Sequence, residues 1–257
     1  MKRGLAIAVL ILIAFSTTGI TRPQRANAFQ PNWLNPGTYV EYSCNVSVYK
    51  GAPYAPTRGT FKWTVVNLTD GYVYILYEMR IEDMSFEKTF KIDTFSNRIK
   101  TIDGKTVENT TNYLWISYVP KIGDVIQLEN LSATVVDLRL VSSRLFIDRA
   151  CWLTNATFTI NGLNMGDLKN ATMDGFIERS YDCETGILVS SRFYIEFKDP
   201  SGKVSQSYFS SILISSTNIP NLMAGRQSST VPVAVTVVIL LSSIFIAVKR
   251  IFQVKQF

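Results

Sequence analysis

The sequence predicts an all-β exported domain followed by a transmembrane helix. Apolar and polar residues alternate with a period of two over most of the chain, which is typical of half-buried antiparallel strands. Short turn motifs separate these segments, and no amphipathic helical pattern interrupts them. Near the end, residues 231–248 carry no charge at all. We therefore expect a curved antiparallel meandering sheet, with a two-sheet β-sandwich as the alternative fold, and a C-terminal membrane span.

The first half of the body gives the clearest strands. Residues 39–49 place one set of apolar side chains on a single face: Val40, Tyr42, Cys44, Val46 and Val48. The same alternation predicts strands over 60–66, 72–83 and 86–92. Asp103-Gly104 is a favoured two-residue hairpin turn, so a small hairpin is expected there.

The second half is less regular. Residues 107–131 predict a connection with one helical turn, and the stretch between Leu153 and Met173 is rich in Asn, Thr and Gly and predicts an exposed loop. Further strands are expected over 133–141, 144–151, 175–181, 187–197 and 204–214. Because most connections can be hairpins, an antiparallel meander fits better than a parallel sheet, but periodicity cannot decide between a meander and a sandwich.

The uncharged run at 231–248 has the length of a membrane span. Its eighteen residues would form a helix of about 27 Å, close to the thickness of a bilayer core. Lys249 and Arg250 follow at once, which favours a cytoplasmic tail at 249–257 and an exterior body. Residues 215–230, rich in Ser, Thr, Asn and Gln, are expected to be a linker.

The N-terminus has the layout of a secretory signal peptide. Lys2 and Arg3 precede an apolar run at 5–15, and Ala26-Asn27-Ala28 is a cleavage pattern. We expect residues 1–28 to be a signal peptide, with an uncleaved N-terminal anchor as the alternative. The β-rich extracellular domain then covers 29–214.

Charge and composition argue against several classes of function. The net charge of +6 comes from the termini, because residues 29–228 contain nineteen basic and all twenty acidic residues. We therefore expect no nucleic-acid partner. Histidine is absent, which removes imidazole-based catalysis and the usual zinc ligands. Four acidic residues in the expected strands 72–83 and 86–92 could be imagined as catalytic: Glu78, Glu82, Asp83 and Glu87. They alternate with Lys and Arg as on a solvated face, so we expect no enzyme, no metal and no cofactor.

Two further patterns fit an exported domain. Six N-x-S/T sequons all lie in the expected exterior and predict N-glycosylation, at Asn45, Asn67, Asn109, Asn130, Asn155 and Asn170. Cys151 and Cys183 are the favoured candidate disulfide pair, with three unpaired cysteines as the alternative. Cys44 is expected to be a buried thiol.

Three segments also carry a resemblance. They are Gly-Thr-Tyr-Val-Glu-Tyr at 37–42, Lys-Ile-Gly-Asp at 121–124 and Tyr-Asp-Cys-Glu-Thr-Gly-Ile-Leu-Val at 181–189. Their order before a terminal span is similar to that of uncharacterised surface proteins common in archaea, which have a secretion signal, a β-rich exterior and one C-terminal anchor. The chain departs from them by placing Cys183 in the late turn. The resemblance implies an archaeal cell-surface location and assigns no site.

Two functional hypotheses follow. The first is a single-pass, glycosylated surface protein of the cell membrane that acts as a non-catalytic module and binds another envelope protein or a glycan. The second is a lipid or hydrophobe carrier whose curved sheet has an apolar concave face. The carrier is suggested by the number of aromatic residues expected to point inward: Phe61, Trp63, Tyr77, Phe86, Phe90, Phe193 and Phe197.

Overall fold

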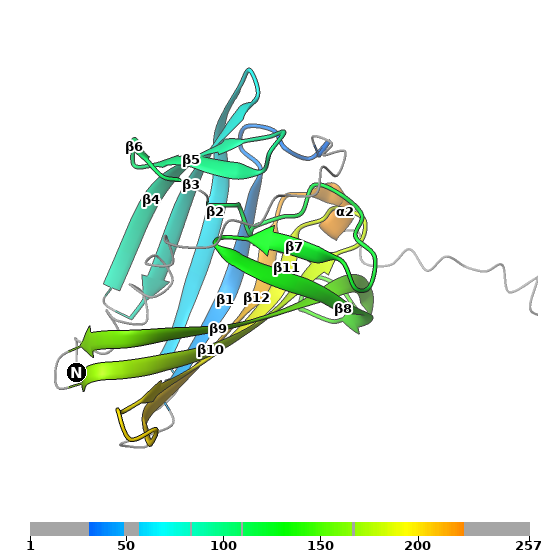
Figure 1. Ribbon diagram of the computed structural model, residues 1–257. Helices are drawn as coiled ribbons and strands as arrows, with labels where there is room; N and C mark the ends of the chain where they lie inside the picture. Colours follow the sequence, from blue (N-terminus) through cyan, green and yellow to red (C-terminus); the bar gives the residue numbers. More distant parts are fainter. Residues whose placement is uncertain (1–30, 49–56, 83, 109, 166–167, 224–257) are drawn as a thin grey trace, which may run out of the picture. The chain divides into compact units, whose positions relative to one another are not determined.

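The chain folds around one large antiparallel sheet (Figure 1). The structure is a computed structural model and describes residues 31–48, 57–82, 84–108, 110–165 and 168–223. In these residues twelve strands follow one another in the order β6-β5-β4-β3-β2-β1-β12-β11-β10-β9-β8-β7. The only break in sequence order is β1 beside β12, which joins two meanders side by side. The all-β fold and the meander are therefore confirmed, and the described residues form one sheet rather than a sandwich.

The strands have the following bounds: β1 Tyr39–Val48, β2 Thr57–Thr69, β3 Tyr72–Ile81, β4 Met84–Asp93, β5 Arg98–Ile102, β6 Lys105–Thr106, β7 Val125–Leu128, β8 Leu131–Val141, β9 Arg149–Met165, β10 Leu168–Asp182, β11 Leu188–Lys198 and β12 Val204–Thr217. A single helical turn, α2 (Pro220–Met223), follows β12. Asp103 and Gly104 have φ angles of 49° and 76° and form the expected hairpin turn between β5 and β6.

One face of the sheet, the inner face, holds the core. Its strand positions follow the predicted alternation: β1 buries Tyr42 and Cys44, and β2 buries Phe61 and Trp63. Polar residues occupy the intervening positions on the outer face. Residues from β1–β3 and from β10–β11 belong to the same apolar cluster, so the sheet wraps around its inner face.

The connection at 110–112 links the two outermost parts of this sheet. The Ile99 N–H donates to the carbonyl of Thr110 at 2.8 Å, on the β5 side. On the β7–β8 side, Thr111 and Glu129 exchange two backbone hydrogen bonds of 3.0 and 2.9 Å. Because hydrogen bonds reach both strand groups from one short segment, the ring of backbone pairing is completed here.

Elsewhere the sheet keeps free edges. β4 pairs with β5 only over residues 90–93, and β9 pairs with β8 only over residues 149–155. In the described part of the chain, no further strand pairs with the remaining halves of β4 and β9. The antiparallel order places the turn at 199–203 at this end of the sheet, which we call the far end. The other end, where the chain leaves β12, is called the exit end.

Several sequence-based boundaries need correction. The expected exposed loop between Leu153 and Met173 is instead the hairpin of β9 and β10, the longest in the sheet. Its Gly162 has a φ of +74° and lies beside register shifts in the pairing, so glycine here supports an irregular strand rather than a loop. β12 continues to Thr217, and Leu222 of α2 is fully buried, so the first part of the expected linker belongs to the domain.

The expected terminal segments are not described by the structure. In the residues that it does describe, no helix is long and apolar enough to cross a membrane. The expected signal peptide at 1–28, the span at 231–248 and the tail at 249–257 all lie outside those residues, as does 224–230.

Candidate functional site on the inner face of the sheet

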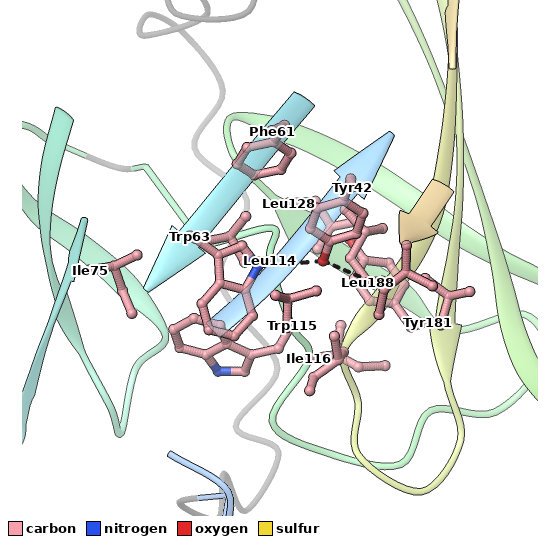
Figure 2. Close-up of a cluster of buried hydrophobic side chains, with 14 of the residues drawn as sticks. Tyr42, Phe61, Trp63, Ile75, Leu114, Trp115, Ile116, Leu128, Tyr181 and Leu188 are labelled. Carbon is pink, nitrogen blue, oxygen red and sulfur yellow. Dashed lines mark hydrogen bonds between the residues drawn. The ribbon is translucent and has the colours of Figure 1, made fainter. Parts of the chain in front are cut away.

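The connection at 107–124 packs onto the inner face (Figure 2). Its residues Leu114, Trp115 and Ile116 are all at least 96% buried. The ring of Trp115 lies 6.1 Å from that of Trp63 and 5.7 Å from that of Trp33. This part of the sheet is therefore filled by the chain's own apolar side chains, which stabilise the fold by burial of large aromatic surfaces.

Backbone bonds fix this segment against the turn before β11. The Ile116 N–H donates to the carbonyl of Gly186, and the Leu188 N–H donates to the carbonyl of Leu114, each at 2.9 Å. The Tyr42 hydroxyl donates to the carbonyl of Leu188 at 2.8 Å and accepts from the Trp63 indole at 3.4 Å (Figure 2). Burial raises the pKa of the Tyr42 hydroxyl far above its ordinary value, so it remains a donor.

A buried ion pair lies on the same face. Arg179 of β10 donates through Nη2 to Oε2 of Glu129 at 2.7 Å, and both side chains are at least 87% buried. The guanidinium carbon lies 4.7 Å from the centre of the Tyr113 ring. Tyr113 donates from its hydroxyl to that of Tyr77 at 3.3 Å, and Tyr181 donates to the carbonyl of Tyr113 at 2.9 Å.

These contacts hold the connection to the sheet. Glu129 provides both the backbone bridge to Thr111 and the carboxylate for Arg179, with a φ of 57°. The nearby Glu129 carboxylate raises the pKa of Arg179 despite its burial, so the guanidinium stays charged. In the described residues, the buried Nε of Arg179 has no hydrogen-bond partner. Breaking the pair from either side would leave an uncompensated charge in an apolar setting, so the two residues are expected to hold the connection in this position.

A second apolar cluster lies on the inner face toward the far end, and we call it the far-end cluster. Its buried members are Met173, Ile195, Phe197 and Tyr208, surrounded by the partly buried Phe158, Ile160, Leu163 and Phe193. The rings of Phe158 and Phe193 stack with centroids 6.2 Å apart. Gly175 provides room for this stack, because a Cβ there would come within 1.9 Å of the Phe158 ring. The cluster is separate from the main core and comes from β9–β12 alone.

Polar side chains organise the exit end. Arg149 of β9 forms an ion pair with the buried Asp182, donates to Glu184 at 2.9 Å, and donates to the carbonyl of Asn221 in α2 at 2.7 Å. Asp182 also accepts from the N–H of Thr185 at 2.7 Å. This network fastens the last described turn of the chain to the sheet.

The expected glycosylation sites differ in their exposure. Asn45, Asn67 and Asn170 are exposed. Asn130 and Asn155 are half-buried, and in the described residues their side-chain oxygens are buried without a hydrogen-bond partner. Asn109 lies outside the described residues. The geometry thus favours the first three as acceptors.

The three cysteines are free thiols in the structure. The Cys183 N–H donates to the carbonyl of Ala150 at 3.0 Å, so Cys183 lies beside the start of β9, and the candidate Cys151–Cys183 bridge stays a prediction. Burial raises the pKa of Cys151 to about 12 and that of Cys44 to about 11, so neither thiol is a reactive nucleophile at neutral pH. Cys183 is half-buried, and burial with the Asp182 charge raises its pKa to about 11.

The acidic residues of β3 and β4 do not converge. Glu78 lies beside Arg80 at 3.8 Å and directly opposite Glu87 on the outer face, while Glu82 is exposed in a turn and Asp83 lies outside the described residues. Among the described side chains, no three Cys, Asp or Glu residues gather closely enough to hold a metal ion.

Sequence reasoning missed the ion pair and the far-end cluster. Arg179 and Glu129 are fifty residues apart, and no local pattern indicates that they meet. The sequence held one signal for the ion pair. Arg179 is a basic residue at an inward position of an otherwise apolar alternation, between Ile177 and Tyr181. The far-end cluster depends on the β9–β10 pairing, which the loop prediction excluded.

Comparison with known proteins identifies no family for this chain. No family model matches it, and no curated protein matches it. Among solved structures, a DUF1329 family protein from Desulfovibrio piger aligns with 75% of this chain and 88% of its own, at 10% identity and a TM-score of 0.17. The described residues form an all-β domain built on one wrapped antiparallel sheet of two joined meanders.

Proposed function

We propose that the protein is a membrane-anchored, exported binding module, without catalytic activity, that holds an apolar ligand such as the acyl chain of a lipid on its inner face. The observation that carries the proposal is the far-end cluster. It gathers eight apolar side chains on one face of a single sheet, and three of them come from the part of β9 that β8 does not cover. A concave, mostly apolar surface with few polar groups is the usual form of a small-molecule site.

The polar residues around the inner face support a neutral ligand. The charges of Arg179 and Glu129 compensate each other, and Lys88 of β4 pairs with Asp103 at 2.5 Å. An additional buried anion or cation would have no unpaired counter-charge among these groups. An uncharged hydrophobe, or the acyl portion of a larger lipid, therefore suits this surface best.

The location of the module is part of the same proposal. The pattern of a signal peptide at 1–28 and the uncharged run at 231–248 support export and anchoring by a single C-terminal span, with 249–257 in the cytoplasm. The exposed sequons at Asn45, Asn67 and Asn170 support a glycosylated exterior. The resemblance to archaeal surface proteins supports a cell-surface location.

A second candidate function is binding of an envelope protein through β8. β8 pairs with β7 only over residues 131–134, and beyond them Val136, Leu138 and Leu140 are 39–60% exposed. A free strand edge with apolar side chains can accept an added strand from a partner.

Native mass spectrometry of the full chain, released from detergent, tests the ligand proposal. Phe193 points to the inner face and the adjacent Tyr194 to the outer face, so Phe193→Ser and Tyr194→Ser form a matched pair. We expect a bound apolar molecule on the wild type and on Tyr194→Ser, and a reduced bound fraction on Phe193→Ser. A wild-type chain that carries no ligand after purification from its host, and takes up no added acyl ligand, would refute the proposal.

A further inference from the structure

The exit end of the sheet presents exposed apolar side chains from its turns. Phe95, in the turn between β4 and β5, is 75% exposed, and Ile147, in the turn between β8 and β9, is 73% exposed. Met223, the last described residue, is 49% exposed. In an antiparallel meander alternate turns share one end, so these three residues lie at the same end of the sheet.

The far end is different. Its described turns contain Glu82 and the polar sequence Asp-Pro-Ser-Gly-Lys at 199–203. In the portion of those turns that the structure describes, no large apolar residue is exposed. Among the described side chains, large apolar residues are therefore exposed in the exit-end turns and not in the far-end turns.

The local structure holds these side chains outward. The Asp93 carboxylate accepts from the N–H groups of Phe95 and Ser96, each at 3.0 Å, so the turn that carries Phe95 is fixed. In the other turn, Ile147 follows Phe146, which is buried. The next residue, Asp148, donates from its N–H to the Ser142 hydroxyl at 3.0 Å. Each apolar tip is thus presented by a hydrogen-bonded turn.

The chain leaves the domain at the exit end, a short distance in sequence before the uncharged run. Arg149 joins α2 to the start of β9 through the carbonyl of Asn221, so the chain leaves the domain beside the turn of Ile147. Val231, the first residue of the uncharged run, follows Met223 by only eight residues. Eight residues span at most about 28 Å, so a bilayer that held 231–248 would lie within that reach of Met223.

We propose that the exit end lies on the membrane and that Phe95, Ile147 and Met223 insert into its interfacial region. The inference rests on the proposed anchoring by 231–248. Aromatic and aliphatic side chains at loop tips partition into the headgroup boundary, and the short connection holds them at high effective concentration beside it. The domain is then held in one orientation, with its far end and the far-end cluster directed away from the anchoring bilayer.

The experiment uses the full chain in phosphatidylcholine vesicles whose acyl chains are brominated, a quencher confined to the bilayer. Phe95→Trp and Ile147→Trp place reporters at exposed positions, and Tyr194→Trp on the outer face of β11 is the matched control. Fluorescence of each variant is compared with that of the wild type to remove the signal of the native tryptophans. We expect at least about twofold stronger quenching of the two exit-end reporters than of the control, because interfacial residues lie about 5–10 Å into the headgroup boundary.

Flotation of the same vesicles after alkaline extraction distinguishes a failure of the proposed orientation from a failure of the proposed membrane anchoring. If the chain floats and all three reporters are quenched equally, anchoring stands and the orientation proposed here is wrong. If the chain does not float, anchoring itself is wrong, and the inference fails with it.

Discussion

Gly186 tests whether the connection at 107–124 is held to the sheet as described. Its φ is +73°, and a Cβ at this position would lie 2.2 Å from the carbonyl oxygen of Ile116, a backbone atom that cannot rotate away. Gly186→Ala therefore adds left-handed strain and forces the connection off the turn. Gly202 is the matched control, because its φ is +82° and a Cβ there would have no neighbour within 4 Å.

The two substitutions share the strain but not the clash. The left-handed conformation costs about 1–2 kcal/mol for alanine in both variants. Only Gly186→Ala also weakens the two 2.9 Å bonds at Ile116 and Leu188, at about 1 kcal/mol each, and overpacks the core around Leu114 by about 1–3 kcal/mol. We expect Gly186→Ala to lose about 3 kcal/mol more than Gly202→Ala, equivalent to about 9 °C in Tm for a domain of this size.

The assay is thermal unfolding of the full chain in detergent, followed by far-UV circular dichroism and by tryptophan fluorescence. Trp115 lies next to the displaced bond, so fluorescence should report a change in its surroundings in Gly186→Ala before unfolding. If the two variants unfold within about 1 kcal/mol of each other, the connection is not packed against this turn. The reasoning for the inner face would then be wrong at its best-defined contact.

Three further predictions follow from individual groups. Burial raises the pKa of the Cys151 thiol to about 12, from an unfolded value of about 8.5, so the contribution of the protonated thiol to the free energy of unfolding is complete below pH 8.5 and is lost as the pH rises toward 12. The urea midpoints measured at pH 8 and at pH 10.5 should therefore differ less in Cys151→Ala than in the wild type. Equal differences in the two proteins would contradict this prediction. Glu129→Gln should lower the free energy of unfolding by about 3 kcal/mol, because it leaves Arg179 charged and unpaired. Adding Arg179→Met should restore part of this loss. Denaturant titrations in which the two losses are strictly additive would exclude the ion pair. Intact mass of the chain from its host should fall by one glycan in Asn45→Gln but stay unchanged, apart from the residue, in Asn155→Gln, and the reverse pattern would contradict the exposure argument.

The sequence predicts the first half of the sheet well because burial there is one-sided. Along most of β1–β3 alternate apolar positions face the core, so period two alone identifies Tyr42, Trp63 and Ile75 as inward residues. The same argument fails over residues 153–173, where ten Asn, Thr and Gly residues interrupt nine apolar ones. The hairpin of β9 and β10 is defined by pairing of the two strands with each other and with β11, which no single segment encodes.

The candidate site was only partly predictable for a related reason. Inward aromatics such as Phe193 and Phe197 were expected on an apolar face, and the structure places both in the far-end cluster. The contact between Arg179 and Glu129 depends on the connection that crosses the inner face, and its position follows from tertiary hydrogen bonds at Thr111 rather than from local propensity. Long-range contacts of this kind leave no periodic trace in the sequence.

The most direct test of the central claim compares the two faces of β11 at adjacent residues. Phe193→Trp puts a reporter on the inner face and Tyr194→Trp puts one on the outer face, both in the full chain in detergent without brominated groups. A brominated acyl ligand is then added at increasing concentration. The proposed function predicts saturable quenching of the Phe193→Trp reporter with little change at Tyr194→Trp. Equal, non-saturating quenching of both reporters would show that the inner face is ordinary protein core and not a binding surface.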